Sequence, residues 1–167
     1  YNLIDDWYYI VNGYEIFKVR QISDILEYSG ISEDKLIYFF SLDEDLNQQI
    51  GKVDDAYLLL ALEKYWGLRL IRGDLWQTII GFVCSSASNI PKIQMNLRLI
   101  CESFGKRVEF DGHIFHTFPS FEKINSLQRL KDAKTGYRAK FIFEICEKFR
   151  EMPDLFEEIK SVDYLRA

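Results

Sequence analysis

The sequence predicts an α+β fold that is mainly α-helical, with an antiparallel sheet at the N-terminus followed by helices. Residues 1–30 are rich in aromatic and β-branched side chains on both sides of Asn12-Gly13, a dipeptide typical of tight hairpin turns. From Ser32 onward, apolar residues recur at helical spacing in segments that begin with a capping residue. The 167 residues, 48% of them hydrophobic and 28% charged, are enough for a domain with a real core.

The N-terminal strands are predicted to form a hairpin around Asn12-Gly13, and a third short strand follows the turn at Ser23-Asp24 and ends at Gly30. Three strands without covering helices do not make a stable core. We therefore expect residues 1–30 to be the remnant of an N-terminal antiparallel sheet domain whose other strands lie upstream. An edge left unpaired by such a truncation favours self-association.

Residues 31–167 are predicted to be part of a central helical domain. Serine, asparagine and aspartate cap helices, and proline fits the first helical turn. The expected elements are a helix from Ser32 to about Phe40, short helices after Asp43, Ser120 and Ser126, a helix from Asp54 to Gly67, helices after Asp74, at 91–104 and after Gly136, a hairpin around Asp111-Gly112, and two last helices that begin at Pro153 and Ser161. On the helix after Asp74 the expected apolar face is Leu75, Ile79, Phe82 and Val83, and on the helix after Gly136 it is Phe141, Ile145 and Phe149.

Small polar side chains interrupt two of these helices at Ser85–Asn89. Ser88 or Asn89 is a good N-cap for the following helix, and Pro91 fits its first turn. A helix N-terminus with Lys92 beside it is also a suitable phosphate site. Capping without any further function is the alternative interpretation of this segment.

Charge is distributed unevenly along the chain. Residues 1–63 carry 13 acidic against 4 basic residues, whereas residues 64–152 carry 9 acidic against 15 basic. A basic middle on an acidic chain is expected if one face meets a polyanion, although it is also compatible with plain solvated surface. The three distant cysteines (Cys84, Cys101 and Cys146) indicate reduced thiols in a reducing compartment. Neither a signal peptide nor an apolar run of membrane-spanning length is present, so we expect an intracellular location.

Three stretches together carry a family resemblance: "GLRLIRGDLWQTIIGFVCSSASNIPKI", "FHTFPSFEKI" and "TGYRAKF". In this order they resemble the 8-oxoguanine DNA glycosylase/AP lyase family of the helix-hairpin-helix superfamily, and the match covers essentially the whole chain. The resemblance implies a base-excision-repair enzyme that flips 8-oxoguanine out of damaged double-stranded DNA and removes it.

The resemblance also implies DNA-binding residues. In the family, polar residues at the helix junction fill the gap left by the flipped base, which points to Ser88 and Asn89; Ala87 departs from the family asparagine at the position of deepest insertion. Tyr137 matches the family's aromatic wedge. Arg138 matches the arginine that reads the estranged cytosine, and Lys92 matches a basic residue nearby.

No catalytic residue is predicted. The family lysine that attacks the sugar, and its partner aspartate, belong to a glycine-rich hairpin and a downstream helix; no Gly-x-Gly follows Pro153, and Lys160 lies outside the motif. We therefore expect a chain truncated before the catalytic hairpin and inactive alone. His113 and His116 lack further ligands at suitable spacing, so neither a metal nor a cofactor is expected. The alternatives are an alkylated-purine glycosylase of the same superfamily and a non-catalytic DNA-binding or scaffold module.

Overall fold

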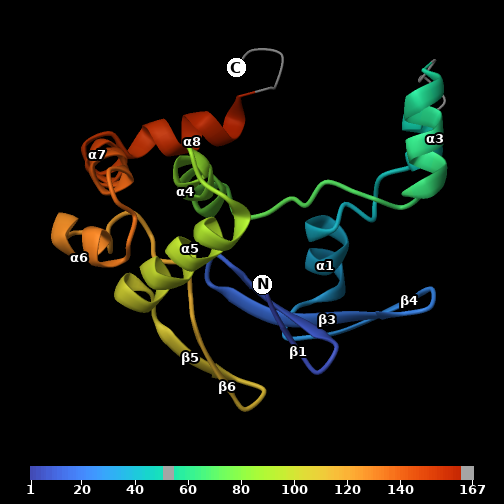
Figure 1. Cartoon of the computed structure of the whole chain (residues 1–167), viewed down its shortest axis with the longest axis horizontal. Coiled ribbons are helices and arrows are strands. Elements are labelled where there is room, and N and C mark those ends of the chain that lie inside the picture. The colour runs from blue at the N-terminus through green and yellow to red at the C-terminus, as the bar shows by residue number, and fades with distance from the viewer. Residues whose placement is uncertain (51–54, 163–167) are drawn as a thin grey trace. The chain divides into compact units, whose positions relative to one another are not determined.

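The computed structural model describes residues 1–50 and 55–162, and its contacts divide the chain into two compact units. One unit comprises Tyr1–Gly30 together with Asp74–Ala167, and the other comprises Ile31–Gly73. Figure 1 shows the strands and helices of both. The predicted separation of residues 1–30 from residues 31–167 as domains stays a prediction.

The N-terminal sheet has four antiparallel strands in the order β1-β2-β3-β4, one more than predicted. They are β1 (Asn2–Ile4), β2 (Trp7–Asn12), β3 (Glu15–Ile22) and β4 (Ile25–Ser29). Three residues are too few to show an alternating pattern, which is why β1 escaped prediction. The turn after Asn12 is confirmed, because Asn12 pairs with Glu15 and Gly13 has φ 58°. Self-association through an edge of this sheet stays a prediction.

Five helices complete the larger unit: α4 (Leu75–Ser85), α5 (Ile90–Phe104), α6 (Leu127–Asp132), α7 (Arg138–Glu151) and α8 (Pro153–Ser161). Asp74, Asn89 and Ser126 cap α4, α5 and α6, and each side chain accepts a hydrogen bond from a backbone N–H of the first turn. The helix expected after Ser120 is wrong, because residues 121–123 form turns. Ser161 is the last residue of α8, and a helix beginning there would fall largely outside the described residues.

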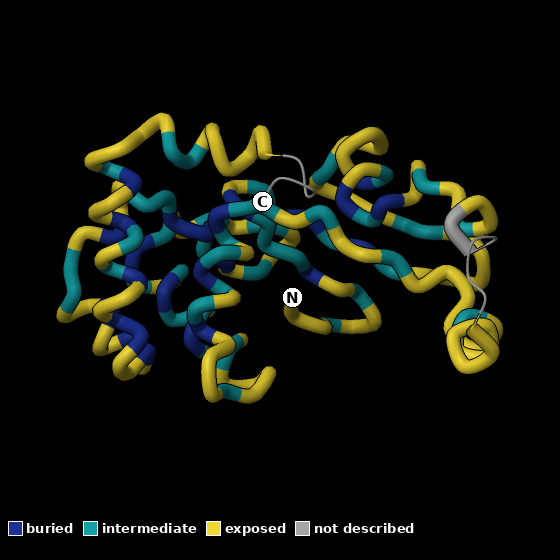
Figure 2. The backbone as a smooth tube through the Cα atoms, turned by 90° about the horizontal axis from the view of Figure 1, so that it is seen from above, coloured by how far each residue is buried: buried dark blue, intermediate teal, exposed yellow. Residues whose placement is uncertain are grey.

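The core of this unit lies between α4, α5, α6 and α7, where the buried segments in Figure 2 gather. The expected inner faces of two helices hold for Ile79, Val83, Ile145 and Phe149, which pack in or against this core, and are wrong for Phe82 and Phe141. On α4 the buried side chains are Trp76, Ile80 and Cys84, whereas Phe82 is 80% exposed. On α7 the buried apolar side chains are Ala139, Ile142, Cys146 and Phe149, whereas Phe141 is 51% exposed. Both helices carry apolar residues on more than one side, so periodicity alone does not select the buried stripe.

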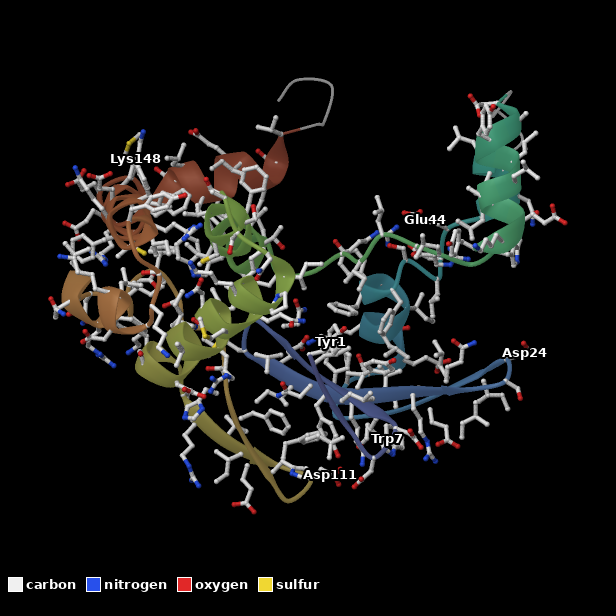
Figure 3. The ribbon with its side chains drawn as sticks, in the orientation of Figure 1. Tyr1, Trp7, Asp24, Glu44, Asp111 and Lys148 are labelled. Atoms are coloured by element: carbon white, nitrogen blue, oxygen red, sulfur yellow. The ribbon has the colours of Figure 1, made fainter. Side chains whose placement is uncertain are left out.

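The predicted hairpin is confirmed as β5 (Arg107–Phe110) and β6 (His113–His116), which turn through Asp111 and Gly112 at positive φ. It packs on the N-terminal sheet, where the rings of Tyr9 and Phe115 stack at 5.4 Å. Asp111 accepts hydrogen bonds from the Tyr9 hydroxyl and from the Lys18 ammonium, both at 2.5 Å. Figure 3 labels Asp111 in this hairpin and Trp7 on the sheet. The hairpin is therefore anchored by an aromatic stack and a charged hydrogen-bond pair.

The second family stretch begins at Phe115 within β6, continues beyond this hairpin, and serves as structural support. The Phe118 N–H donates to the carbonyl of Gly13 at 2.8 Å, and the Trp76 indole N–H donates to the carbonyl of Pro119 at 2.9 Å. A Cβ on Gly105, at the end of α5, would lie 2.0 Å from the carbonyl oxygen of Thr117. Only glycine permits this close approach. The segment thus joins the sheet, α4 and α5 into one unit.

The smaller unit contains α1 (Glu33–Phe39), α2 (Leu46–Ile50) and α3 (Ala56–Lys64). Ser32 is the N-terminal flanking residue of α1, as predicted, but its side chain makes no capping hydrogen bond. The expected helix start at Asp43 is wrong: Asp45 accepts from the backbone N–H groups of Asn47 and Gln48 in the first turn of α2. Asp43 instead binds the Arg72 guanidinium at 2.8 Å.

The predicted cap of α3, Asp54, lies outside the described residues, and Asp55 accepts from the backbone N–H groups of Tyr57 and Leu58. The helix ends at Lys64, earlier than the expected Gly67. None of the α3 side chains is buried within the described chain. Over residues 1–50 and 55–162, no helix combines the length and the apolar character that a membrane crossing requires.

Candidate nucleic-acid interface

The junction between α4 and α5 is a compact turn. Ser86 is the C-cap of α4, Ala87 adopts a positive φ of 46°, and the Ser88 N–H donates to the carbonyl of Ser85 at 3.1 Å. The Asn89 side chain then accepts from the backbone N–H of Lys92 at 3.0 Å and opens α5. Of the two predicted caps, Asn89 is therefore the one that operates.

A second turn, between α6 and α7, places two further side chains. Lys134 and Gly136 have φ of 57° and 63°, and between them the buried Thr135 hydroxyl donates to the carbonyl of Leu130 at 2.7 Å. Positive φ suits glycine, which has no Cβ to clash. The chain leaves this turn with Tyr137 preceding the first residue of α7, Arg138.

Arg138 connects the two turns. Its side chain is buried, with 2% of the residue exposed, and its guanidinium donates to the backbone carbonyls of Ser86 and Ala87, the Ala87 contact at 3.1 Å. A third carbonyl, that of Thr135, lies 3.5 Å from Nη1. A buried charge is costly unless it is hydrogen-bonded, and these carbonyls satisfy that requirement. In this state the guanidinium holds the α4–α5 turn and does not face solvent.

Tyr137 lies on the outside of the same arrangement. The residue is 57% exposed, while its hydroxyl lies 3.2 Å from both the carbonyl oxygen and the hydroxyl of Ser86. The Arg138 guanidinium sits 4.6 Å from the ring centroid, within the range of a cation–π contact. The ring is thus presented to solvent in a fixed orientation.

Of the five predicted DNA-binding residues, the structure brings Tyr137 and Arg138 into contact with the α4–α5 turn, whereas Lys92 lies apart on α5. Tyr137 and Arg138 both bind the turn that immediately precedes Ser88 and Asn89 in the sequence. The Ser88 hydroxyl oxygen is buried without a hydrogen-bond partner among the described residues, and Asn89 uses its carbonyl oxygen as a cap. Lys92 is exposed on the first turn of α5.

Sequence reasoning missed Ser86 as a partner in this arrangement. The Ser86 hydroxyl contacts the Tyr137 hydroxyl, and the Ser86 carbonyl accepts a hydrogen bond from the Arg138 guanidinium. These partners lie 51 and 52 positions further along the chain. No local sequence signal reports a contact over that distance. The resemblance alone indicated that these two segments act together.

The thiols offer no reactive group. Burial raises the pKa of Cys84 to about 11, although the nearby Arg138 charge acts in the opposite direction. Burial is also the main cause that raises the pKa of Cys101 and of Cys146 to about 12. A nucleophilic cysteine needs a lowered pKa, so packing is the role that these values support. In the part of the chain that the structure describes, no three metal-binding side chains gather.

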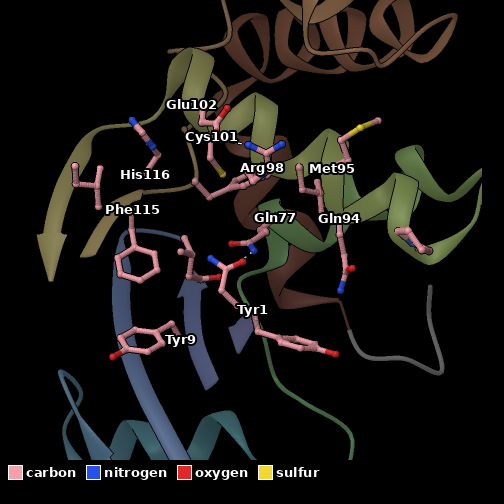
Figure 4. Close-up of a pocket in the computed structure, with 16 residues that line it drawn as sticks. Tyr1, Tyr9, Gln77, Gln94, Met95, Arg98, Cys101, Glu102, Phe115 and His116 are labelled. Atoms are coloured by element: carbon pink, nitrogen blue, oxygen red, sulfur yellow. Dashed lines mark hydrogen bonds and ion pairs between the residues drawn. The ribbon is translucent and has the colours of Figure 1, made fainter. Parts of the chain in front are cut away.

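A cavity of about 420 Å³ lies between α5, β2 and β6 (Figure 4). Tyr9 and Phe115 form an aromatic side, and Gln77, Gln94 and Arg98 supply polar groups. None of the five predicted DNA-binding residues is among the residues that line it. The cavity therefore does not belong to the arrangement around Arg138.

Comparison with known proteins identifies the fold. No family model matches the sequence. An N-glycosylase/DNA lyase of Saccharomyces cerevisiae is 30% identical over 149 residues, which are 80% of this chain and 39% of the relative. The structure of MBOgg1 in complex with a low-affinity DNA ligand is similar with a TM-score of 0.82 and 26% identity, covering 98% of this chain and 57% of that one.

A crystal structure of the Clostridium acetobutylicum 8-oxoguanine glycosylase/lyase, in complex with double-stranded DNA containing cytosine opposite 8-oxoguanine, has the same fold. Its TM-score is 0.86 at 22% identity, over 94% of this chain and 57% of that one. The chain thus spans about two fifths of the yeast relative and somewhat over half of the solved chains. Its architecture, an N-terminal antiparallel sheet with a mainly helical remainder, is that of the DNA N-glycosylase/lyases. Within that class, the chain belongs to the N-glycosylase/DNA lyase (OGG1) family.

Proposed function

We propose that this chain is the DNA-binding portion of a base-excision-repair N-glycosylase/AP lyase that flips 8-oxoguanine out of duplex DNA and removes it. One observation carries the proposal: Tyr137 and Arg138 are held on the α4–α5 turn by hydrogen bonds to Ser86. The residues predicted as wedge and base reader thus contact the turn that leads into Ser88 and Asn89, which supports their acting together. Family membership supports the lesion class, and acting on DNA would place the protein wherever the DNA is.

Tyr137 is suited to the role of wedge. A ring that separates two stacked bases must keep its orientation when it is inserted between them. Aromatic rings stack on bases with little loss of conformational entropy. The Tyr137 ring is exposed, while its hydroxyl is tied to Ser86. Stacking against an opened step would offset part of the unstacking cost of flipping.

Arg138 is suited to reading an unpaired base only after it changes partners. An orphaned cytosine presents N3 and O2 as neighbouring acceptors, which match the parallel N–H groups of a guanidinium. In the structure those groups are bound to the carbonyls of Ser86 and Ala87. We propose that DNA binding exchanges these carbonyls for the base, so the loop and the reader rearrange together.

Lys92 is suited to a phosphate contact. It is exposed at the N-terminus of α5, which has 15 residues. The first-turn N–H groups and the helix dipole favour an anion there. The contact would position the duplex without reading its sequence.

No residue of this chain is proposed to break the glycosidic bond. Two lysines of the C-terminal helices form ion pairs: Lys140 lies 3.7 Å from Glu144, and Lys160 lies 2.8 Å from Glu157. We propose that the 167-residue chain binds lesion duplex but neither excises the base nor forms an adduct that borohydride traps. Single-turnover excision of 8-oxoguanine by a purified preparation, with a full-length family member as positive control, would overturn this part of the proposal.

The test of binding compares duplexes that differ only at the lesion. Fluorescence anisotropy with 8-oxoguanine opposite cytosine, with undamaged guanine, and with an alkylated purine should rank the first as tightest. The alkylated purine is included because Ala87 offers no polar group to an orphaned base, which keeps another lesion specificity open. Tighter binding of the alkylated duplex would replace 8-oxoguanine with that lesion, and equal binding of all three would indicate a non-specific DNA-binding module.

A further inference from the structure

The exposed side of α7 carries an aromatic residue that the sequence placed in the core. The helix buries Ala139, Ile142 and Cys146, whereas Phe141 leaves 51% of its surface in water. Exposing half of a phenyl ring forgoes hydrophobic stabilisation. A single exposed apolar residue is normal on a protein surface, so what singles out Phe141 is the set of groups around it.

Phe141 lies one helical turn after Tyr137, so the two rings share a face of the helix. Their centroids are 6.4 Å apart with an interplanar angle of 85°, an edge-to-face arrangement that aromatic pairs prefer. Because the Tyr137 hydroxyl is anchored to Ser86, its ring is held at two points, by Ser86 at one end and by Phe141 along its side. The two rings together form an aromatic pair whose exposed surfaces face solvent from the same turn of helix.

Positive charge flanks this aromatic pair along the chain. Lys134, in the turn before α7, and Lys140, within its first turn, are both exposed. The ion pair of Lys140 with Glu144 is long, at 3.7 Å, and both side chains are more than half exposed, so it neutralises Lys140 only weakly. Aromatic rings interspersed with lysines are the pattern of surfaces that stack on bases and neutralise phosphates at once.

We propose that Phe141 is a second DNA-contacting residue, whose ring lies against the duplex beside the step that Tyr137 opens. The same ring supports the Tyr137 ring through their edge-to-face contact. This inference rests on the proposed function. Because a phenyl ring has no hydrogen-bonding group, its contact is with base or sugar faces, and it adds affinity for an unstacked duplex without choosing the opposite base. Phe141 would therefore act in flipping and not in base reading.

The test uses the whole chain and a duplex with a stable abasic-site analogue opposite cytosine, next to a 2-aminopurine that reports unstacking. Phe141→Ala should weaken binding about 5- to 150-fold, the range expected from losing one base–aromatic contact, and should lower the 2-aminopurine signal at saturation. Phe141→Leu, which keeps apolar bulk and the fold, should show the same defects to a smaller degree. The loss should be equal for all four opposite bases.

Tyr14→Ala is the matched control, because Tyr14 is a 69% exposed aromatic in the turn between β2 and β3, and it should leave binding unchanged. If both Phe141 variants bind like the unchanged chain while Tyr137→Ala binds weakly, Phe141 does not touch DNA and this inference is wrong, whereas the proposed function stands. If Tyr137→Ala also binds normally, the proposed function itself fails. Thermal unfolding of each Phe141 variant gives the fraction of protein that is unfolded at the assay temperature. If that fraction accounts for the loss of binding, Phe141 has a structural role and the inference is wrong.

Discussion

The Arg138 guanidinium donates hydrogen bonds to the backbone carbonyl of Ser86, 52 positions earlier in the chain. The residue proposed to read the orphaned base thereby holds the loop proposed to fill the gap. Any change at Arg138 therefore alters both folding stability and DNA recognition, and these effects can be measured separately.

Arg138→Ala should lower the free energy of unfolding by about 1–3 kcal/mol, because the carbonyls of Ser86 and Ala87 lose their donors. It should also blur discrimination between the four bases opposite the lesion, since a bidentate contact is lost. Urea unfolding measures the first effect, and binding to four matched duplexes measures the second. Arg138→Lys keeps the charge without the planar fork, so it should recover part of the stability but not the discrimination. A uniform loss over all four duplexes would leave Arg138 as a brace for the turn only.

Lys92→Ala should weaken binding to damaged and undamaged duplexes alike and reduce the slope of log affinity against log salt by about one, because one phosphate contact is lost. Anisotropy titrations at several salt concentrations give this slope. Lys123→Ala is the control, since Lys123 is exposed in a turn between β6 and α6 and should leave the slope unchanged. A changed preference for the opposite base would assign Lys92 to base reading instead.

Ala87 has a φ of 46°, a left-handed conformation that costs an alanine about 1–2 kcal/mol and that glycine and asparagine adopt more readily. Ala87→Gly should therefore raise the free energy of unfolding without improving recognition. Ala87→Asn should do both, because its amide can hydrogen-bond an unpaired base. Ser23→Asn, at φ 52° in the turn between β3 and β4, is the control for a purely conformational gain. Unimproved binding by Ala87→Asn would show that this position does not enter the gap.

Asp111 should make stability depend on pH. Its hydrogen bond with Lys18, followed by the one with Tyr9, lowers the pKa of the carboxyl below its ordinary value of 3.8. In turn, the Asp111 hydrogen bond is the main cause that raises the pKa of Tyr9 to about 12. A depressed carboxyl pKa stabilises the fold above the unfolded value, and that contribution is lost as the pH falls from 3.8 through the lower folded value.

Thermal unfolding of the wild-type chain and Asp111→Asn across this pH range tests the linkage. The variant should be less stable at neutral pH, and the difference should shrink as the pH falls below 3.8. Asp24→Asn, at the tip of the β3–β4 hairpin, is the control and should show no such convergence. A difference between wild type and Asp111→Asn that stays constant with pH would mean that the carboxylate charge is not what anchors the hairpin.

Sequence by itself determined the features that depend on neighbouring residues. The turns at Asn12-Gly13 and Asp111-Gly112 and the caps at Asp74 and Asn89 are set by local backbone preferences and by hydrogen bonds over two or three positions. Family motifs added the membership and the pair Tyr137 and Arg138. These signals lie within a few residues of what they specify, so a single sequence contains them.

Tertiary structure alone decided which side of each apolar helix is buried and which distant groups meet. Phe82 and Phe141 match a helical apolar pattern yet lie exposed, because Ile80, Cys84, Ile142 and Cys146 occupy the shared core. The contact between Arg138 and Ser86 likewise exists only when α4 and α7 pack together. Burial and long-range hydrogen bonding depend on the whole three-dimensional arrangement, and no local pattern encodes which of several possible faces that arrangement selects.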